Sequence, residues 1–226
     1  MKIKHLLFAI LLYSNLSFAG VFLELLPGTD KIFRGRAPKA TEMNILVETG
    51  ITTIVIFKNQ LKTEVDDEIT SLTAVGISKK KIYHIPFLWK DVRSEQLACE
   101  QVIQALGVLA KVERSANDKV LFHCTVGEDR TGLLAGLMTQ LLDQEDANQS
   151  YINQMCAKGY AGGNPSKPKN VSLTVDKYLT PLYFKISTLI QQGRLSRSHL
   201  DKKLCAEIST LDTESNQKTC SENTGR

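Results

Sequence analysis

The chain has 226 residues, of which 42% are hydrophobic and 23% are charged, and its formal net charge is +4. A chain of this size can bury a sizeable core within one domain. Without the predicted signal peptide described below, the charge falls to +2, which is too mild to indicate a nucleic acid or an anionic membrane as a partner. The sequence contains no internal repeat and no low-complexity tract.

Residues 1–19 have the pattern of a secretory signal peptide, with a basic start at Lys2 and Lys4, an apolar core at 6–12 and small residues before Gly20. The apolar core is too short for a membrane-spanning helix. Cleavage before Gly20 would leave 207 residues (226 − 19) with a charge of +2, because two lysines leave with the signal. We therefore expect an exported protein, periplasmic or secreted, with no membrane anchor. Its oligomeric state stays open.

Strand and helix patterns alternate along the first half of the chain. Runs of β-branched and apolar residues predict strands, and apolar residues at helical spacing predict helices. We expect strands at 21–26, 31–36, 51–57 and 81–85. We expect helices at 41–49, at 63–76 and at 94–115, and the second of these begins with a capping-box pattern at Thr63 and ends at Gly76.

The second half continues the alternation, with a strand at 119–122, a helix from Leu133, further helices at 146–158, 171–192 and 196–208, and a loop at 159–170. This order predicts an α/β fold with a central, mostly parallel sheet flanked by helices. Ligands of such sheets bind at the carboxyl ends of the strands. The predicted domain covers 20–208, and a polar tail covers 209–226. The loop is interpreted as a solvated connector rather than as a border of a site.

Residues 123–132, with the sequence HCTVGEDRTG, are the most informative segment. They lie between a predicted strand and a predicted helix, so backbone N–H groups and the positive helix end converge on one point, which suits an anion. Cys124 and Arg130 stand at the two edges of that point. A thiol and a guanidinium around an anion site predict covalent catalysis on a phosphate ester.

Each residue type in the segment has a chemical reason. Cys124 is the expected nucleophile, since amides, a helix N-terminus and a nearby cation stabilise its thiolate. Arg130 can hold two phosphate oxygens with its planar fork. Gly127 permits a positive φ and a close approach to bound oxygens. Thr131 can donate its hydroxyl to the departing sulfur, and His123 is expected to brace the loop as structural support.

The pattern His-Cys-x-x-Gly-x-x-Arg-Thr-Gly resembles the signature of the cysteine-dependent tyrosine and dual-specificity phosphatases, over about residues 21–160. The resemblance implies a dual-specificity phosphatase type of fold, hydrolysis through a phosphocysteine, and no metal or cofactor. Its substrate would be a phosphoprotein or a small phosphomonoester. The loop that binds the phosphate would consist of Thr125, Val126, Gly127, Glu128, Asp129 and Arg130.

The same resemblance implies a general acid upstream of the nucleophile. Asp91 lies 33 positions before Cys124, and Trp89-Lys90-Asp91 resembles the Trp-Pro-Asp loop of the family with lysine in place of proline. The alternative is that Asp91 is an ordinary turn residue before a helix capped by Ser94.

Two carboxylates in the loop bear on the substrate. Glu128 and Asp129 at the rim would repel a second phosphate, unless they point to solvent or to the protein's own backbone. We therefore favour a tyrosine or dual-specificity protein phosphatase. An inositol polyphosphate or phosphoinositide phosphatase is the alternative within the family. A phosphate-binding module without turnover and a sulfurtransferase are the alternatives from other classes.

The five cysteines bear on the compartment. In an oxidising compartment an odd count leaves one thiol free, and the nucleophile Cys124 must be that thiol. Cys205 and Cys220 lie close together in sequence, so a bridge between them is one expectation. The alternative is that both are free or pair elsewhere.

Overall fold

The structure is a computed structural model, and it describes residues 22–87, 94–211 and 220. The predicted signal peptide at 1–19 and the predicted general acid Asp91 lie outside these residues. None of the described helices is long and apolar enough to cross a membrane.

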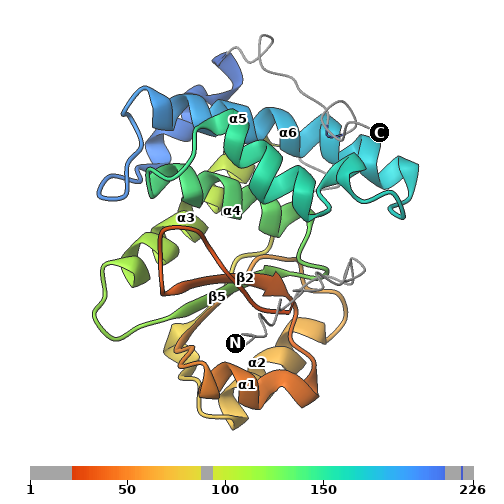
Figure 1. The fold of residues 1–226 in the computed structure, drawn as a ribbon, viewed down its shortest axis with the longest axis vertical. Coiled ribbons are helices and arrows are strands. Elements are labelled where there is room, and N and C mark those ends of the chain that lie inside the picture. Colours follow the sequence, from red (N-terminus) through yellow and green to blue (C-terminus); the bar gives the residue numbers. More distant parts are fainter. Residues whose placement is uncertain (1–21, 88–93, 212–219, 221–226) are drawn as a thin grey trace, which may run out of the picture.

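A five-stranded sheet forms the middle of the molecule, in the order β1-β2-β5-β3-β4 (Figure 1). Only β1 is antiparallel to its neighbour, and the other three pairings are parallel. The predicted α/β class with a mostly parallel sheet is confirmed. The strands are β1 (Glu24–Leu25), β2 (Ile32–Arg36), β3 (Thr53–Ile56), β4 (Ile82–His84) and β5 (Val120–Cys124).

The central strand β5 carries Cys124 to the carboxyl edge of the sheet. Its register pairs Arg36 of β2 with Cys124 and Ile56 of β3 with His123. All five residues of β5 are buried, as expected for a parallel strand covered on both faces. The last residues of three neighbouring strands therefore meet beside Cys124.

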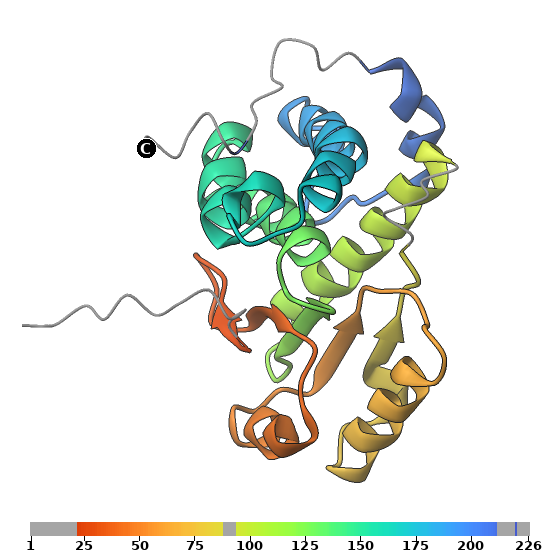
Figure 2. The same cartoon turned by 90° about the vertical axis from the view of Figure 1, so that its right-hand side faces the viewer.

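Helices cover both faces of the sheet (Figures 1 and 2). One layer contains α1 (Met43–Glu48) and α2 (Glu64–Ala74), and the other contains α3 (Glu95–Glu113), α4 (Asp129–Leu141) and α6 (Lys169–Gln191). Strand side chains alternate between the two layers because successive residues point to opposite faces. Ile54, Ile56 and Leu121 pack with α1 and α2, whereas Val55, Val120 and Phe122 pack with α3, α4 and α6.

Two predicted helices differ from the structure. The expected helix at 146–158 is broken into α5 (Ala147–Ser150), a π turn (Tyr151–Met155) and a 3-10 turn (Cys156–Lys158), and the wider π turn places Tyr151, Gln154 and Met155 in the interior. The expected helix at 196–208 begins only at Lys202, because residues 196–199 form a β-bridge and the Asp201 side chain caps the 3-10 helix Lys202–Thr210. The remaining 3-10 turns are Ala40–Glu42, Lys79–Lys81 and Ala161–Gly163.

The helix starts also test the predicted caps. Ser94 accepts a hydrogen bond from the Leu97 amide at 3.2 Å, so this cap is as expected. Thr63 makes no side-chain cap hydrogen bond. Instead the Gln60 side chain accepts from the Val65 amide at 2.9 Å. A partner from outside the predicted motif therefore caps α2.

Two disulfides link segments that are far apart in the sequence. They join Cys99 to Cys205 and Cys156 to Cys220, across 106 and 64 residues. The expected Cys205–Cys220 bridge is wrong, because α3 packs beside the 3-10 helix Lys202–Thr210 and so presents Cys99 to Cys205. Cys124 is the free cysteine, as the odd count predicted.

Candidate active site

The turn between β5 and α4, residues 124–130, is called the signature loop here. It forms the floor of a cavity of about 580 Å³. One wall comes from Asn59 and Leu61 after β3, and the other from residues 164–171 ahead of and within α6. A second cavity of about 590 Å³ lies elsewhere, between α3, α4 and the end of α6, and its lining contains no cysteine or histidine.

Cys124 lies at the bottom of the cavity and is only 1% exposed. Its backbone N–H donates to Thr131 Oγ1 at 2.9 Å, and that hydroxyl also lies 3.3 Å from the Gly35 carbonyl, to which it can donate. Burial raises the pKa of the Cys124 thiol. This effect is outweighed by four groups that favour the thiolate: the Arg130 charge, the Thr131 hydroxyl and the amides of Thr131 and Gly127. The net pKa of Cys124 therefore lies below the ordinary value. The site favours a thiolate, which is the nucleophilic form.

Arg130 lies in the first turn of α4, and its guanidinium donates to Thr125 Oγ1 at 3.1 Å. It lines the cavity together with Cys124. The amides at the α4 N-terminus and this guanidinium therefore surround the space above the thiol. Both features favour a bound anion.

Gly127 has a φ of +79°, as expected. A Cβ at this position would lie 2.8 Å from both the Arg36 nitrogen and the Gly35 carbonyl carbon. The close approach that requires glycine is therefore to the backbone of β2. The signature loop packs against β2 at Gly127, and this contact helps to set the direction of its amides.

Arg34 was missed by sequence reasoning. It is 3% exposed and donates to the Gln154 carbonyl at 2.5 Å and to the Gly127 carbonyl at 3.3 Å. Burial lowers the pKa of Arg34 to about 10, against the raising effects of Glu24 and of the Cys124 thiolate. A second guanidinium thus lies behind the signature loop. The available signal was an arginine on the buried face of a predicted strand, two residues after Ile32.

His123 is fully buried and connects the signature loop to α2. Its Nδ1 donates to the Cys124 carbonyl at 3.0 Å, and its Nε2 lies 2.8 Å from Glu68 Oε1. The other Glu68 oxygen lies 2.9 Å from Lys58 Nζ. Burial raises the pKa of Glu68, but the lowering effects of His123 and Lys58 are together larger. The net pKa therefore lies below the ordinary value, and the carboxylate is charged. The bracing geometry expected of His123 is present, and Glu68 and Lys58 are additions that the sequence did not single out.

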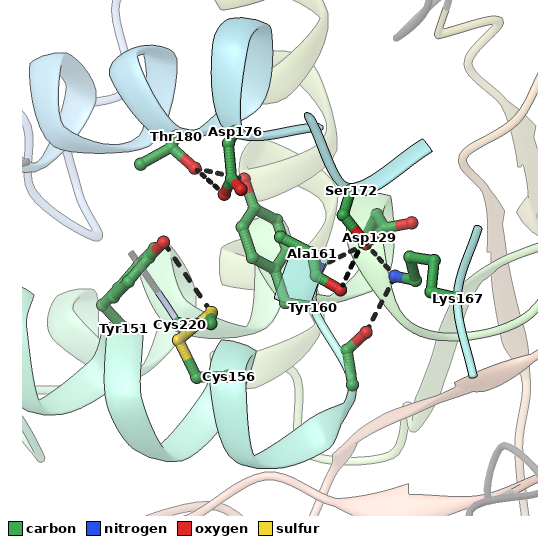
Figure 3. The surroundings of a disulfide bond; sticks show 11 residues. Asp129, Tyr151, Cys156, Tyr160, Ala161, Lys167, Ser172, Asp176, Thr180 and Cys220 are labelled. Atoms are coloured by element: carbon green, nitrogen blue, oxygen red, sulfur yellow. Dashed lines mark hydrogen bonds and ion pairs between the residues drawn. A yellow bond between two sulfur atoms is a disulfide. The ribbon is translucent and has the colours of Figure 1, made fainter. Parts of the chain in front are cut away.

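The rim carboxylates face the protein's own chain, and Figure 3 shows this for Asp129. Lys167 Nζ lies 3.0 Å from Glu128 Oε2 and also contacts Asp129 Oδ1. The Ala161 amide donates to Asp129 at 3.0 Å, and the Asn164 amide group donates to Glu128 at 2.9 Å. Both carboxylates thus bind the protein's own segment at 159–170. Of the two readings that the sequence left open, the structure has the second, because both carboxylates point to the protein's own chain, where a cation and two amides engage them.

The segment at 159–170, called the C-terminal loop here, is also not the solvated connector that we expected. Asn164, Ser166 and Lys167 line the cavity with Cys124 and Arg130. Of the other predicted substrate contacts, Thr125 and Val126 line the same cavity, and Val126 is 50% exposed. Among the described residues, no group of three or more His, Cys, Asp or Glu side chains is placed to hold a metal ion.

Three solved structures are similar to this chain at low identity. TpbA of P. aeruginosa, solved in complex with phosphotyrosine, is 17% identical, with 70% of this chain and 88% of that chain covered and a TM-score of 0.46. PTP-2 phosphatase of Cydia pomonella is 14% identical, with 70% and 88% covered and a TM-score of 0.48. The core catalytic domain of Siw14, a PP-IP phosphatase of S. cerevisiae, is 17% identical, with 69% and 84% covered and a TM-score of 0.47.

A comparison with curated protein sequences found no match. A sequence model of the tyrosine phosphatase family matches residues 29–150, which is more than half of the chain and includes the whole signature loop. The chain therefore belongs to the tyrosine phosphatase family of cysteine-based phosphatases.

Proposed function

We propose that this protein hydrolyses phosphate monoesters through a phosphocysteine on Cys124, as a tyrosine or dual-specificity protein phosphatase. The observation that carries the proposal is a buried thiol with a lowered pKa at the bottom of a cavity, facing Arg130 and the N-terminus of α4. This arrangement stabilises negative charge both on the nucleophile and on the phosphoryl oxygens.

The reaction has two steps. The Cys124 thiolate attacks phosphorus, the bond to the leaving oxygen breaks, and that oxygen takes a proton from a general acid, for which we propose Asp91. Water then attacks the phosphocysteine and gives a proton back to the Asp91 carboxylate, the P–S bond breaks, and the thiolate and inorganic phosphate are released. Arg130 holds the phosphoryl oxygens in both steps, and the Thr131 hydroxyl, beside Cys124, stabilises the departing sulfur.

The cavity rim supports a substrate with an apolar group next to the phosphate. Leu61 is 63% exposed and Val126 50% exposed, and Val171 lines the same cavity. Among the described lining residues the cations are Arg130 and Lys167, and Lys167 is paired with two carboxylates. A phosphotyrosine ring can pack on such a rim, whereas a polyphosphorylated ring needs several free cations.

The test compares the wild type with Cys124→Ser on phosphotyrosine peptides, phosphothreonine peptides and inositol hexakisphosphate. We expect the wild type to prefer phosphotyrosine, to use phosphothreonine more slowly and to keep its activity in the presence of a chelator. Cys124→Ser should still bind vanadate but lose turnover. An inositol phosphate with the highest kcat/KM would instead identify a polyphosphate phosphatase, and full activity of Cys124→Ser would refute the phosphocysteine.

We also propose that the protein is exported and acts in the periplasm or outside the cell. The two disulfides support this, because such bonds persist in oxidising compartments. N-terminal sequencing of the protein from the periplasm or medium should begin at Gly20. Recovery of the uncleaved chain in the cytoplasm would contradict the proposal.

A further inference from the structure

Lys167 lies in the cavity wall but outside the part of the chain that the family shares. The family match ends at residue 150, and Lys167 belongs to the C-terminal loop. Its side chain is only 5% exposed. A lysine is rarely this buried unless its charge is paired, so its partners indicate what it does.

Among the described residues, the oxygen atoms that Lys167 Nζ contacts lie at the N-terminus of α4 or in its own loop. Its Nζ contacts Glu128 and Asp129, and it donates to the Gly159 carbonyl at 2.8 Å. Figure 3 shows the Lys167 ammonium pointing toward Asp129. Glu128 is the N-cap of α4, and Asp129 is its first residue. The same helix end faces the phosphate site.

The two carboxylates at this helix end weaken its attraction for other anions. A helix N-terminus attracts any anion, so Glu128 and Asp129 compete there with the thiolate and with the phosphate. Without Lys167 this pair carries a charge of −2, and with Lys167 the cluster carries −1. The lysine also fastens the C-terminal loop to α4, which places Asn164 and Ser166 in the cavity wall.

We propose that Lys167 is a positioning residue for the reaction, which offsets the charges of Glu128 and Asp129 beside the phosphate site and holds the C-terminal loop as the second wall of the cavity. The inference rests on the proposed function for its kinetic consequence only. Its electrostatic consequence, at the Cys124 thiol, can be measured without any substrate.

Other charged groups also face this cluster and this thiol. Asp176 of α6 lies nearby, and burial raises its pKa, with Asp129 adding to the rise and Thr180 and Lys167 opposing it. Arg34 and Arg130 also interact electrostatically with Cys124. These groups stay in place in the variants below, so a change in the titration of Cys124 reports the altered cluster.

The main experiment measures the rate of Cys124 alkylation by iodoacetamide as a function of pH. Cys124 is the free cysteine of the folded protein, so the label reports one thiol. In Lys167→Met we expect the midpoint of the profile to rise by about one pH unit, the lower end of what a nearby charge produces. With para-nitrophenyl phosphate, KM should rise by about tenfold and kcat should change less.

A second variant separates charge balance from a merely structural role. Glu128→Gln removes one negative charge and keeps an oxygen that can accept from Asn164. Combined with Lys167→Met, it restores the cluster charge to −1, so we expect the double variant to return most of the way to the wild-type midpoint. Glu128→Gln alone should lower the midpoint, which tests the same idea even if Lys167→Met fails to fold.

The matched control is Lys81→Met. Lys81 Nζ lies 2.5 Å from Asp118 Oδ1. Asp118 comes just before the amino end of β5, whereas Cys124 lies at its carboxyl end. Lys81→Met should leave the midpoint and KM unchanged. The inference is overturned if Lys167→Met keeps the wild-type midpoint, or if the double variant behaves like Lys167→Met. Because alkylation needs no turnover, a protein inactive on every phosphate ester would refute the proposed function and leave this result standing.

Discussion

Replacing Arg34 by methionine separates the contribution of a buried guanidinium to stability from its contribution to catalysis. Arg34 donates to the carbonyls of Gln154 and Gly127 from a position that is 3% exposed. Its loss leaves two acceptors without that donor, at about 2 kcal/mol each, or about 4 kcal/mol in total.

The charge of Arg34 carries a cost that the substitution removes. Burial lowers its pKa to about 10, and at 1.36 kcal/mol per pH unit this corresponds to about 3 kcal/mol against the charged form. Both the folded and the unfolded chain hold the charge at pH 7, so this cost is fully present there. The two contributions nearly cancel. We expect Arg34→Met to lower the free energy of unfolding by only about 1 kcal/mol, and Tm by about 2–4 °C.

The catalytic loss should be much larger than the loss of stability. Without Arg34 the Gly127 carbonyl is free to turn, and the amides of the signature loop turn with it. Misplacing such donors by about 1 Å can cost about 10²-fold in rate. We therefore expect kcat/KM on para-nitrophenyl phosphate to fall by about 10²-fold.

The assay pairs kcat/KM with thermal unfolding, and Arg194→Met is the control because its partner Glu207 is exposed and distant from the cavity. The control should change both quantities little. The reasoning is refuted if Arg34→Met keeps kcat/KM within about twofold of the wild type, or if its unfolding free energy falls by about 5 kcal/mol or more.

Further outcomes are expected from other changes. Arg130→Lys should lower kcat/KM by at least about 10²-fold, because lysine cannot hold two oxygens in one plane; near-normal activity would contradict the assigned geometry. Asp91→Asn should lower kcat by about 10²–10⁴-fold on alkyl phosphates and less on substrates with weakly basic leaving groups, whereas equal losses would point to another acid. The pKa of Cys124 is lower in the folded than in the unfolded chain. The difference in unfolding free energy between the wild type and Cys124→Ser should therefore shift in favour of the wild type as pH rises from the folded toward the unfolded pKa of Cys124. This shift should be lost again as pH falls through the folded pKa; parallel pH curves would contradict this. Reduction of both disulfides should lower Tm strongly, since each closes a loop of more than 60 residues, worth roughly 4 kcal/mol, and an unchanged Tm would show that the bridges are dispensable.

The chemistry of the signature loop could be predicted from the sequence because it is local. Cys124, Gly127, Arg130 and Thr131 lie within eight consecutive residues, and the strand before them and the helix after them determine how such a turn must run. The alternation of strands and helices likewise predicted the parallel sheet, since hydrophobic periodicity reports which face of each element is buried.

Only the tertiary structure decided which distant groups surround that loop. Arg34, Glu68 and Lys167 reach it from β2, from α2 and from the C-terminal loop. The disulfide partners of Cys156 and Cys99 were decided in the same way. The physical reason is that periodicity identifies a buried face but not the element that covers it. A charge on such a face, or a lysine in a loop, shows its role only once packing has brought its partner within hydrogen-bonding distance.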